Sequence, residues 1–177
     1  MKKILILISA LLILFITMLS CEKDDICPPE VLTTPHLIIT FHDIISREER
    51  KAVPSLRVVG EDNNTIVNTF DDRVSAGLDS IALPLKVYSP SSSFIFISNS
   101  ASEEDNPDTE MGNADIVTFN YDNTEVFISR GCGYANNYEN LVGTFEEGSD
   151  GDRWIISLEI VDNTVDNQNA AHVKIYH

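Results

Sequence analysis

The fold is decided by residues 36–42, His-Leu-Ile-Ile-Thr-Phe-His, where a two-residue period first appears. Leu37, Ile39 and Phe41 would all lie on one face of a strand, because successive side chains in a strand point to opposite faces. The alternation therefore predicts a strand with one face turned to a hydrophobic core. Residues 81–88 repeat the same alternation further along the chain.

Short apolar runs separated by polar turns continue to the end of the chain, and two of them also indicate a position in a sheet. Pro84 cannot donate a hydrogen bond to a ladder, which places residues 81–88 at a sheet edge or at a bulge. Residues 94–97 are apolar on both faces, which predicts a central strand. The predicted strands are residues 37–42, 56–59, 65–70, 81–88, 94–97, 115–121, 124–130, 154–160 and 172–176, and residues 141–145 are a further candidate.

The turn between two of these strands is predicted at Asp122-Asn123, which would close a hairpin. No window after residue 20 shows a sustained helical period, so helices are not expected. Eight or nine short strands with polar turns predict an all-β antiparallel sandwich, immunoglobulin-like in shape, over residues 36–177. A β-barrel is the alternative architecture.

The N-terminus has the features of a lipoprotein signal peptide, predicted over residues 1–20. Two lysines precede an apolar segment over residues 4–19, which is short for a membrane-spanning helix of about 20 residues. Ser20 and Cys21 complete a lipobox, which predicts cleavage before Cys21 and lipidation of that residue. Residues 21–35, which contain three prolines, are predicted to be the lipidated tether.

The charge of the chain limits its partners. Removal of residues 1–20 would leave 157 of the 177 residues and would change the net charge from −16 to −18, because two lysines leave with the signal. Nucleic acid and anionic lipid head groups both need a basic surface, so neither is an expected partner. No later segment is long and apolar enough to span a bilayer, so we expect a soluble domain held by a lipid.

No catalytic motif is present, since the chain has neither a Gly-x-Ser-x-Gly elbow nor a His-Glu-x-x-His pair. We expect the four histidines, His36, His42, His172 and His177, at the surface or at sheet edges rather than around a metal. The acidic clusters lack the spacing of an EF-hand calcium loop and are expected to form a solvated acidic rim, with calcium binding by these loops as the alternative. The sequence therefore predicts no metal site, no cofactor and no enzymatic activity. Two carboxylates in a deep cleft would instead indicate a hydrolase.

Aromatic side chains are candidates for sugar binding, because flat rings stack on pyranose faces. Trp154 begins an alternating stretch with Ile156 and Leu158, which predicts a core position for the indole. Tyr134 and Tyr138 are the better candidates for an exposed platform.

Cys27 and Cys132 are the two cysteines that remain beside Cys21. An exported protein meets an oxidising compartment, so we predict a disulfide between them rather than a reactive thiol at Cys132. The bond would pin the end of the tether to the strand that ends at Arg130.

Four segments carry a family resemblance: Cys-Glu-Lys-Asp-Asp-Ile-Cys-Pro-Pro at 21–29, Phe-Asn-Tyr at 119–121, Phe-Ile-Ser-Arg-Gly-Cys-Gly-Tyr at 127–134 and His-Val-Lys-Ile-Tyr-His at 172–177. They resemble an uncharacterised envelope lipoprotein family of Bacteroidota-type bacteria, known only as a domain of unknown function. The resemblance covers the mature chain and implies an envelope lipoprotein without an assigned activity. It also suggests an outer-membrane barrel protein as a partner, because such proteins are often encoded beside one.

Two short patterns resemble signals used by such bacteria. The tripeptide Asp-Ser-Ile at 79–81 resembles an O-glycosylation acceptor, which makes Ser80 a candidate site. Lys23, Asp24 and Asp25 follow the lipidated cysteine almost directly and resemble the signal that exports lipoproteins to the cell surface. The domain is therefore expected on the outer face of the outer membrane, with periplasm-facing attachment as the alternative.

These observations favour a non-enzymatic lipoprotein of the outer membrane that binds or scaffolds another envelope component. A surface lipoprotein that binds glycans through Tyr134 and Tyr138 is the alternative.

Overall fold

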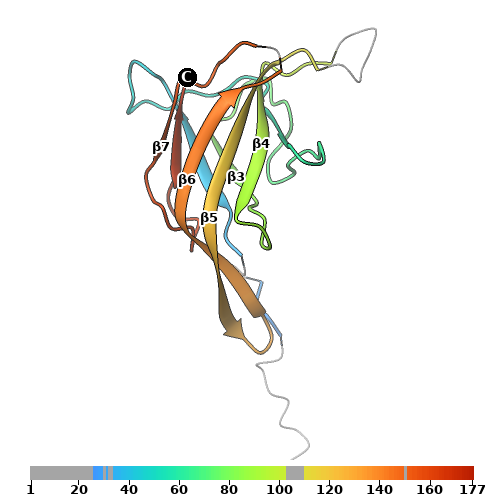
Figure 1. Ribbon diagram of the computed structural model, residues 1–177, viewed down its shortest axis with the longest axis vertical. Helices are drawn as coiled ribbons and strands as arrows, with labels where there is room; N and C mark the ends of the chain where they lie inside the picture. The colour runs from blue at the N-terminus through green and yellow to red at the C-terminus, as the bar shows by residue number, and fades with distance from the viewer. Residues whose placement is uncertain (1–25, 30, 32–33, 103–109, 150) are drawn as a thin grey trace, which may run out of the picture.

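The computed structural model describes residues 26–29, 31, 34–102, 110–149 and 151–177, and these form two packed four-stranded sheets (Figure 1). One sheet has the strand order β3-β1-β8-β7 and the other the order β2-β4-β5-β6. The strands are β1 (Leu37–His42), β2 (Arg57–Gly60), β3 (Ser80–Leu83), β4 (Ser91–Ser98), β5 (Asn113–Ser129), β6 (Gly133–Glu147), β7 (Ser157–Ile160) and β8 (Val173–Tyr176). The predicted all-β sandwich is confirmed, and the two sheets do not close into the alternative barrel.

The core lies between the sheets and is built from alternating residues, as the two-residue period predicts. Leu37, Ile39 and Phe41 of β1 are fully buried. Phe96 of β4 and Phe119 of β5 approach from the opposite sheet and are also fully buried. Burying a large apolar side chain contributes about 1.5–3 kcal/mol, so these facing residues hold the two layers together.

Two positions in the sheets, one predicted from Pro84 and one from the apolar run 94–97, are confirmed. β3 is an edge strand of its sheet and ends at Leu83, one residue before Pro84. β4 is a central strand, paired with β2 on one side and β5 on the other. The sequence thus located both an edge and a centre correctly.

The antiparallel prediction is wrong for one pair of strands. β8 pairs parallel with β1, in a register that runs from Ile39 opposite Val173 to His42 opposite Tyr176. β8 enters between β1 and β7 and thereby fills the second edge of β1. A run of four residues carries no sequence signal for the direction of its partner, so this pairing could not be predicted.

The hairpin turn predicted at Asp122-Asn123 is also wrong. β5 continues through these residues to Ser129, and the chain reverses just before Gly133, which has a φ of +72°. A register shift between β5 and β6 lies between Asn120 and Asp122. The turn-forming residues therefore accommodate a β-bulge, which uses the same local chemistry as a turn.

Three predicted strands are shorter than expected. The strand predicted over residues 81–88 ends at Leu83. Residues 65–70 form only an isolated bridge, between Ile66 and Val59. The strand predicted from Trp154 begins at Ser157, and Ile155 rather than Ile156 is buried. The residues that lead into β7 are held in place by a side chain of another strand, β5.

A buried carboxylate in β5 holds the segment that leads into β7. Asp115 Oδ2 accepts hydrogen bonds from the backbone N–H groups of Trp154 and Ile155, at 3.0 and 2.7 Å. The indole of Trp154 packs against the core, and its Nε1 donates to the carbonyl of Phe96 at 3.1 Å. Trp154 is therefore part of the fold, as predicted, although it is only partly buried.

Candidate functional site

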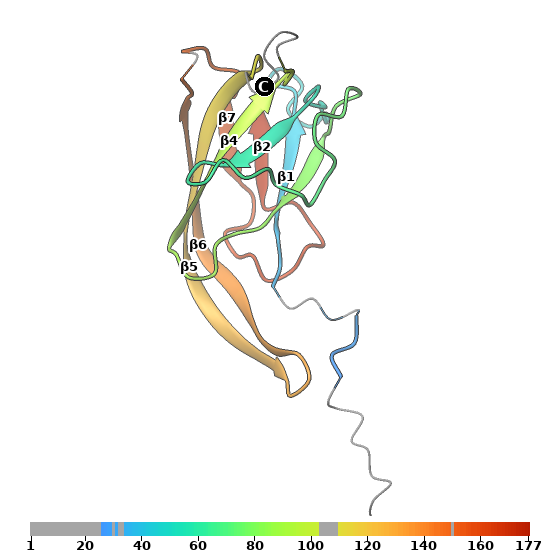
Figure 2. The ribbon, with the colours of Figure 1, turned by 90° about the vertical axis from the view of Figure 1, so that its right-hand side faces the viewer.

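A long β-hairpin projects from one end of the sandwich. The pairing of β4 with β5 stops where Ser91 lies opposite Asn120, whereas β5 and β6 stay paired out to Ser129 and Gly133. Residues 121–139 therefore extend beyond the two sheets as a two-stranded arm, which we call the arm. Figure 2 shows it curving away from the end of the molecule where the C-terminus lies.

Two buried tyrosines fix the base of the arm. The rings of Tyr121 and Tyr138 meet edge to face, with centroids 5.0 Å apart. The hydroxyl of Tyr138 donates to the carbonyl of Leu85 at 3.1 Å, and that of Tyr121 donates to the carbonyl of Lys86 at 3.0 Å. Burial raises the pKa of Tyr138 to about 12, so its hydroxyl stays protonated and keeps donating at any physiological pH. The arm is therefore attached rigidly rather than as a loose loop.

The tip of the arm is joined covalently to the tether. Cys27 and Cys132 form a disulfide, with their Cα atoms 4.6 Å apart, so this prediction is confirmed. Thr34 Oγ1 also accepts a hydrogen bond from the N–H of Asn136, at 3.4 Å. The tether therefore contacts the arm at two described residues, Cys27 at the tip and Thr34 opposite Asn136.

The predicted aromatic platform is not formed. Tyr138 is fully buried at the base of the arm, whereas Tyr134 is 61% exposed near the tip. Tyr134 and Tyr138 lie on the same face of β6, so their different distances from the sandwich explain the difference in burial. Only the base of the arm reaches the core. Tyr134 instead lies opposite Phe127, which is 57% exposed, and the two rings meet edge to face at 5.3 Å. Sequence spacing within one strand could not reveal a pair formed across two strands.

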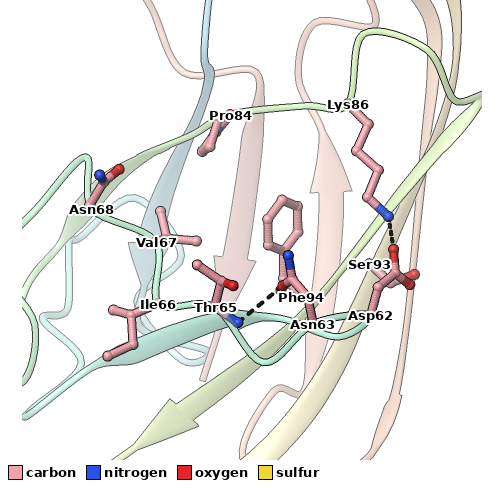
Figure 3. A pocket seen from close by; sticks show the side chains of 11 residues that line it. Asp62, Asn63, Thr65, Ile66, Val67, Asn68, Pro84, Lys86, Ser93 and Phe94 are labelled. Atoms are coloured by element: carbon pink, nitrogen blue, oxygen red, sulfur yellow. Dashed lines mark hydrogen bonds and ion pairs between the residues drawn. The ribbon is translucent and has the colours of Figure 1, made fainter.

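A shallow pocket of about 270 Å³ lies beside β2 and β4 (Figure 3). The buried side chains of Val67 and Phe94 form its apolar lining together with Pro84. Asn68 and an ion pair between Lys86 and Asp62 supply polar groups. The volume is just below the usual range of about 300–1,000 Å³ for ligand pockets, so the pocket suits only a small molecule. No sequence pattern indicates this pocket, because its lining comes from three separate segments.

Glu110 is the centre of a network of ion pairs and hydrogen bonds. Arg57 and Arg73 approach Glu110 at 3.0 and 2.8 Å. Ser100 and the N–H groups of Ala101 and Gly112 also donate to its carboxylate. Burial alone would raise the pKa of Glu110, but the hydrogen bonds, that from Arg73 foremost, lower it to about 2. A carboxylate that is saturated in this way cannot serve as a general base at neutral pH.

Two of the four histidines contradict the prediction that all four lie at the surface or at sheet edges. His42 and His172 are buried, and burial lowers the pKa of both imidazoles. His172 Nδ1 accepts a hydrogen bond from the N–H of Ile38, so it joins β8 to β1. The sequence did hold a signal for this burial, because His42 follows Phe41 and His172 lies between Ala171 and Val173. Within the described ranges, no group of three or more His, Cys, Asp or Glu side chains is placed to hold a metal.

Of the remaining predicted sites, four lie outside the described residues and one lies in β3. Cys21, Lys23, Asp24 and Asp25 fall outside the described residues. Ser80 is the first residue of the edge strand β3 and is half-buried. The described residues contain no helix with the length and hydropathy needed to cross a bilayer.

The two sheets, the arm and the disulfide define the chain as a β-sandwich protein with a covalently tethered hairpin. It belongs to the DUF6452 family, a family of unknown function whose profile matches residues 55–177. The predicted relation to an uncharacterised family is thereby confirmed, and the match includes both arm strands and Cys132. No curated protein and no solved structure was found to match the chain.

Proposed function

We propose that the protein is an outer-membrane lipoprotein, anchored through Cys21, whose sandwich is a non-enzymatic module that binds or scaffolds another envelope component. The observation that carries the proposal is the disulfide between Cys27 and Cys132. A disulfide is expected in an exported protein, and this one fastens the domain six residues after the predicted lipidation site. A domain held so close to its anchor suits a module that works at the membrane surface.

The partner best suited to this placement is another protein of the same membrane, such as an outer-membrane barrel protein. Affinity capture of the lipidated protein from detergent-solubilised envelopes is expected to recover one such protein in stoichiometric amount. The Cys21→Ser variant should lose both the acyl chains and this partner, because it no longer concentrates at the membrane. Equal recovery with wild type and with an unrelated lipoprotein as bait would contradict the scaffolding role.

The proposed orientation is toward the outside of the cell, through the export signal at Lys23, Asp24 and Asp25. Proteinase added to intact cells should therefore digest the wild-type domain. The variant in which all three residues are replaced by alanine should be protected, while remaining in the membrane fraction. Protection of the wild type, in cells whose known surface lipoproteins are digested, would instead support periplasm-facing attachment.

Glycan binding is a second candidate function. Because Tyr138 is buried, the pocket beside β4, rather than a pair of tyrosines, would hold the sugar. Asn68 and the Lys86–Asp62 pair offer hydrogen-bonding groups over an apolar lining, as a sugar ring requires. Binding of a neutral oligosaccharide that is lost in Asn68→Ala, with Val142→Ala on the far strand β6 as control, would favour this candidate over scaffolding.

A further inference from the structure

The tip of the arm exposes apolar side chains that no part of the described protein covers. Phe127 and Tyr134 are 57% and 61% exposed and lie opposite each other on β5 and β6. Ile26, which precedes the disulfide-bonded Cys27, is 81% exposed. Three large apolar groups are therefore presented to the surroundings at the most distant point of the arm.

The charge of the same segment differs from that of the rest of the molecule. Residues 126–138 contain no Asp or Glu and one basic residue, Arg130, although the chain has 28 acids. Acids return on both sides, at Glu125 and Glu139. A strongly acidic protein would be repelled from a negatively charged membrane surface, so within the sandwich domain this segment is better suited than the acidic remainder to contact one. The acids nearest to Ile26 in the sequence are Asp24 and Asp25, which precede it in the tether.

The disulfide brings this segment close to the predicted anchor. Six residue steps separate Cys21 from Cys27, and an extended chain covers at most about 3.6 Å per residue, or roughly 22 Å in all. The head-group layer is about 5–8 Å thick on each side of the hydrocarbon core. The arm tip is thus held within reach of the membrane that holds the lipid.

From these observations we propose that the tip of the arm docks in the head-group layer of the same membrane, with Phe127 and Tyr134 inserted. The inference rests on the proposed lipidation of Cys21. Aromatic rings with an apolar body, and in Tyr134 a polar hydroxyl, are the groups favoured at membrane interfaces. Glu125 shares a strand face with Phe127 at about 7 Å, which limits insertion to the last residues of the arm. Lipid and tip together would set the orientation of the domain.

Fluorescence of the full mature lipoprotein in zwitterionic phosphatidylcholine vesicles tests the proposal. An indole introduced by Phe127→Trp should be quenched strongly by lipids brominated on their acyl chains and should emit at a shorter wavelength. The matched control is Val142→Trp, at a position on β6 that is 54% exposed and lies eight residues from Tyr134, or about 27 Å along the strand. The native Trp154 packs near the C-terminal His177 and serves as an internal reference.

We expect quenching at position 127 to exceed that at position 142 several-fold. Adding Tyr134→Ser to Phe127→Trp should reduce it, whereas vesicle flotation should remain complete because the acyl chains dominate binding. Equal quenching at the two positions in protein that floats would overturn the inference alone. An indole unquenched by lipid but shielded from acrylamide in native outer membranes would assign the tip to a protein partner and also overturn it. Mature protein whose mass shows no acyl chains would overturn the proposed function and the inference together.

Discussion

Replacing Cys27 and Cys132 together by serine is expected to lower the free energy of unfolding by up to about 4.7 kcal/mol, the chain-entropy value for a loop of about 100 residues. The sequence separation of the two cysteines is 105, so the disulfide closes a loop that contains β1 to β5. Opening it returns conformational freedom to the unfolded chain while leaving the core contacts in place. Denaturant unfolding followed by the fluorescence of Trp154 measures the change.

Wild-type protein treated with a reducing agent is the control. It should unfold at the same denaturant concentration as the double variant. Hydrogen exchange of the backbone amides measures the local effect of losing the disulfide. Amides at the tip of the arm should lose protection, while those near Tyr121 and Tyr138 should keep it, because the two tyrosines hold the base independently. Unchanged unfolding midpoints in both reduced and substituted protein would show that the disulfide constrains nothing in the unfolded state.

Replacing Glu110 by glutamine is expected to lower stability at pH 7 by about 3 kcal/mol. The pKa of Glu110 falls from an ordinary value of 4.5 to about 2 in the folded protein, and one pKa unit corresponds to about 1.4 kcal/mol. A carboxyl whose pKa is lower in the folded state stabilises the protein above the unfolded pKa. This contribution is lost as the pH falls from about 4.5 toward 2.

Unfolding curves collected between pH 7 and pH 2 test this expectation. The wild type should lose stability over the acidic interval, and the difference between wild type and Glu110→Gln should shrink toward zero at the acidic end. Glu125→Gln is the control, since it removes one acid from an exposed position on the arm. A constant difference between wild type and Glu110→Gln across the whole range would refute the role assigned to the carboxylate.

The sequence was sufficient where the responsible signal is local. The alternation at Leu37, Ile39 and Phe41 predicted a buried face, and Pro84 predicted an edge or a bulge, of which the edge is observed. The disulfide could be predicted because an exported protein with two remaining cysteines is expected to pair them in an oxidising compartment. No geometric information was needed. These features depend on one residue type or on one short period.

The sequence failed where distant segments decide the outcome. Asp122-Asn123 has the composition of a turn, yet its pairing with β6 turns it into a bulge within a longer strand. The arm was missed for that reason, and with it the contact between Phe127 and Tyr134. Tyr138 could not be recognised as buried, because its hydrogen-bond partner Leu85 lies 53 residues away.

The position of the disulfide also has a mechanical consequence for a domain anchored as proposed. A pulling force that enters through the N-terminal segment divides at Cys27 between two routes. One follows the tether into β1, and the other crosses to Cys132 and runs along both strands of the arm into β5 and β6. Because β1 and β5 belong to different sheets, tension would be shared by both layers instead of peeling β1 away first. Drag on the cell envelope would then load the sandwich as a whole.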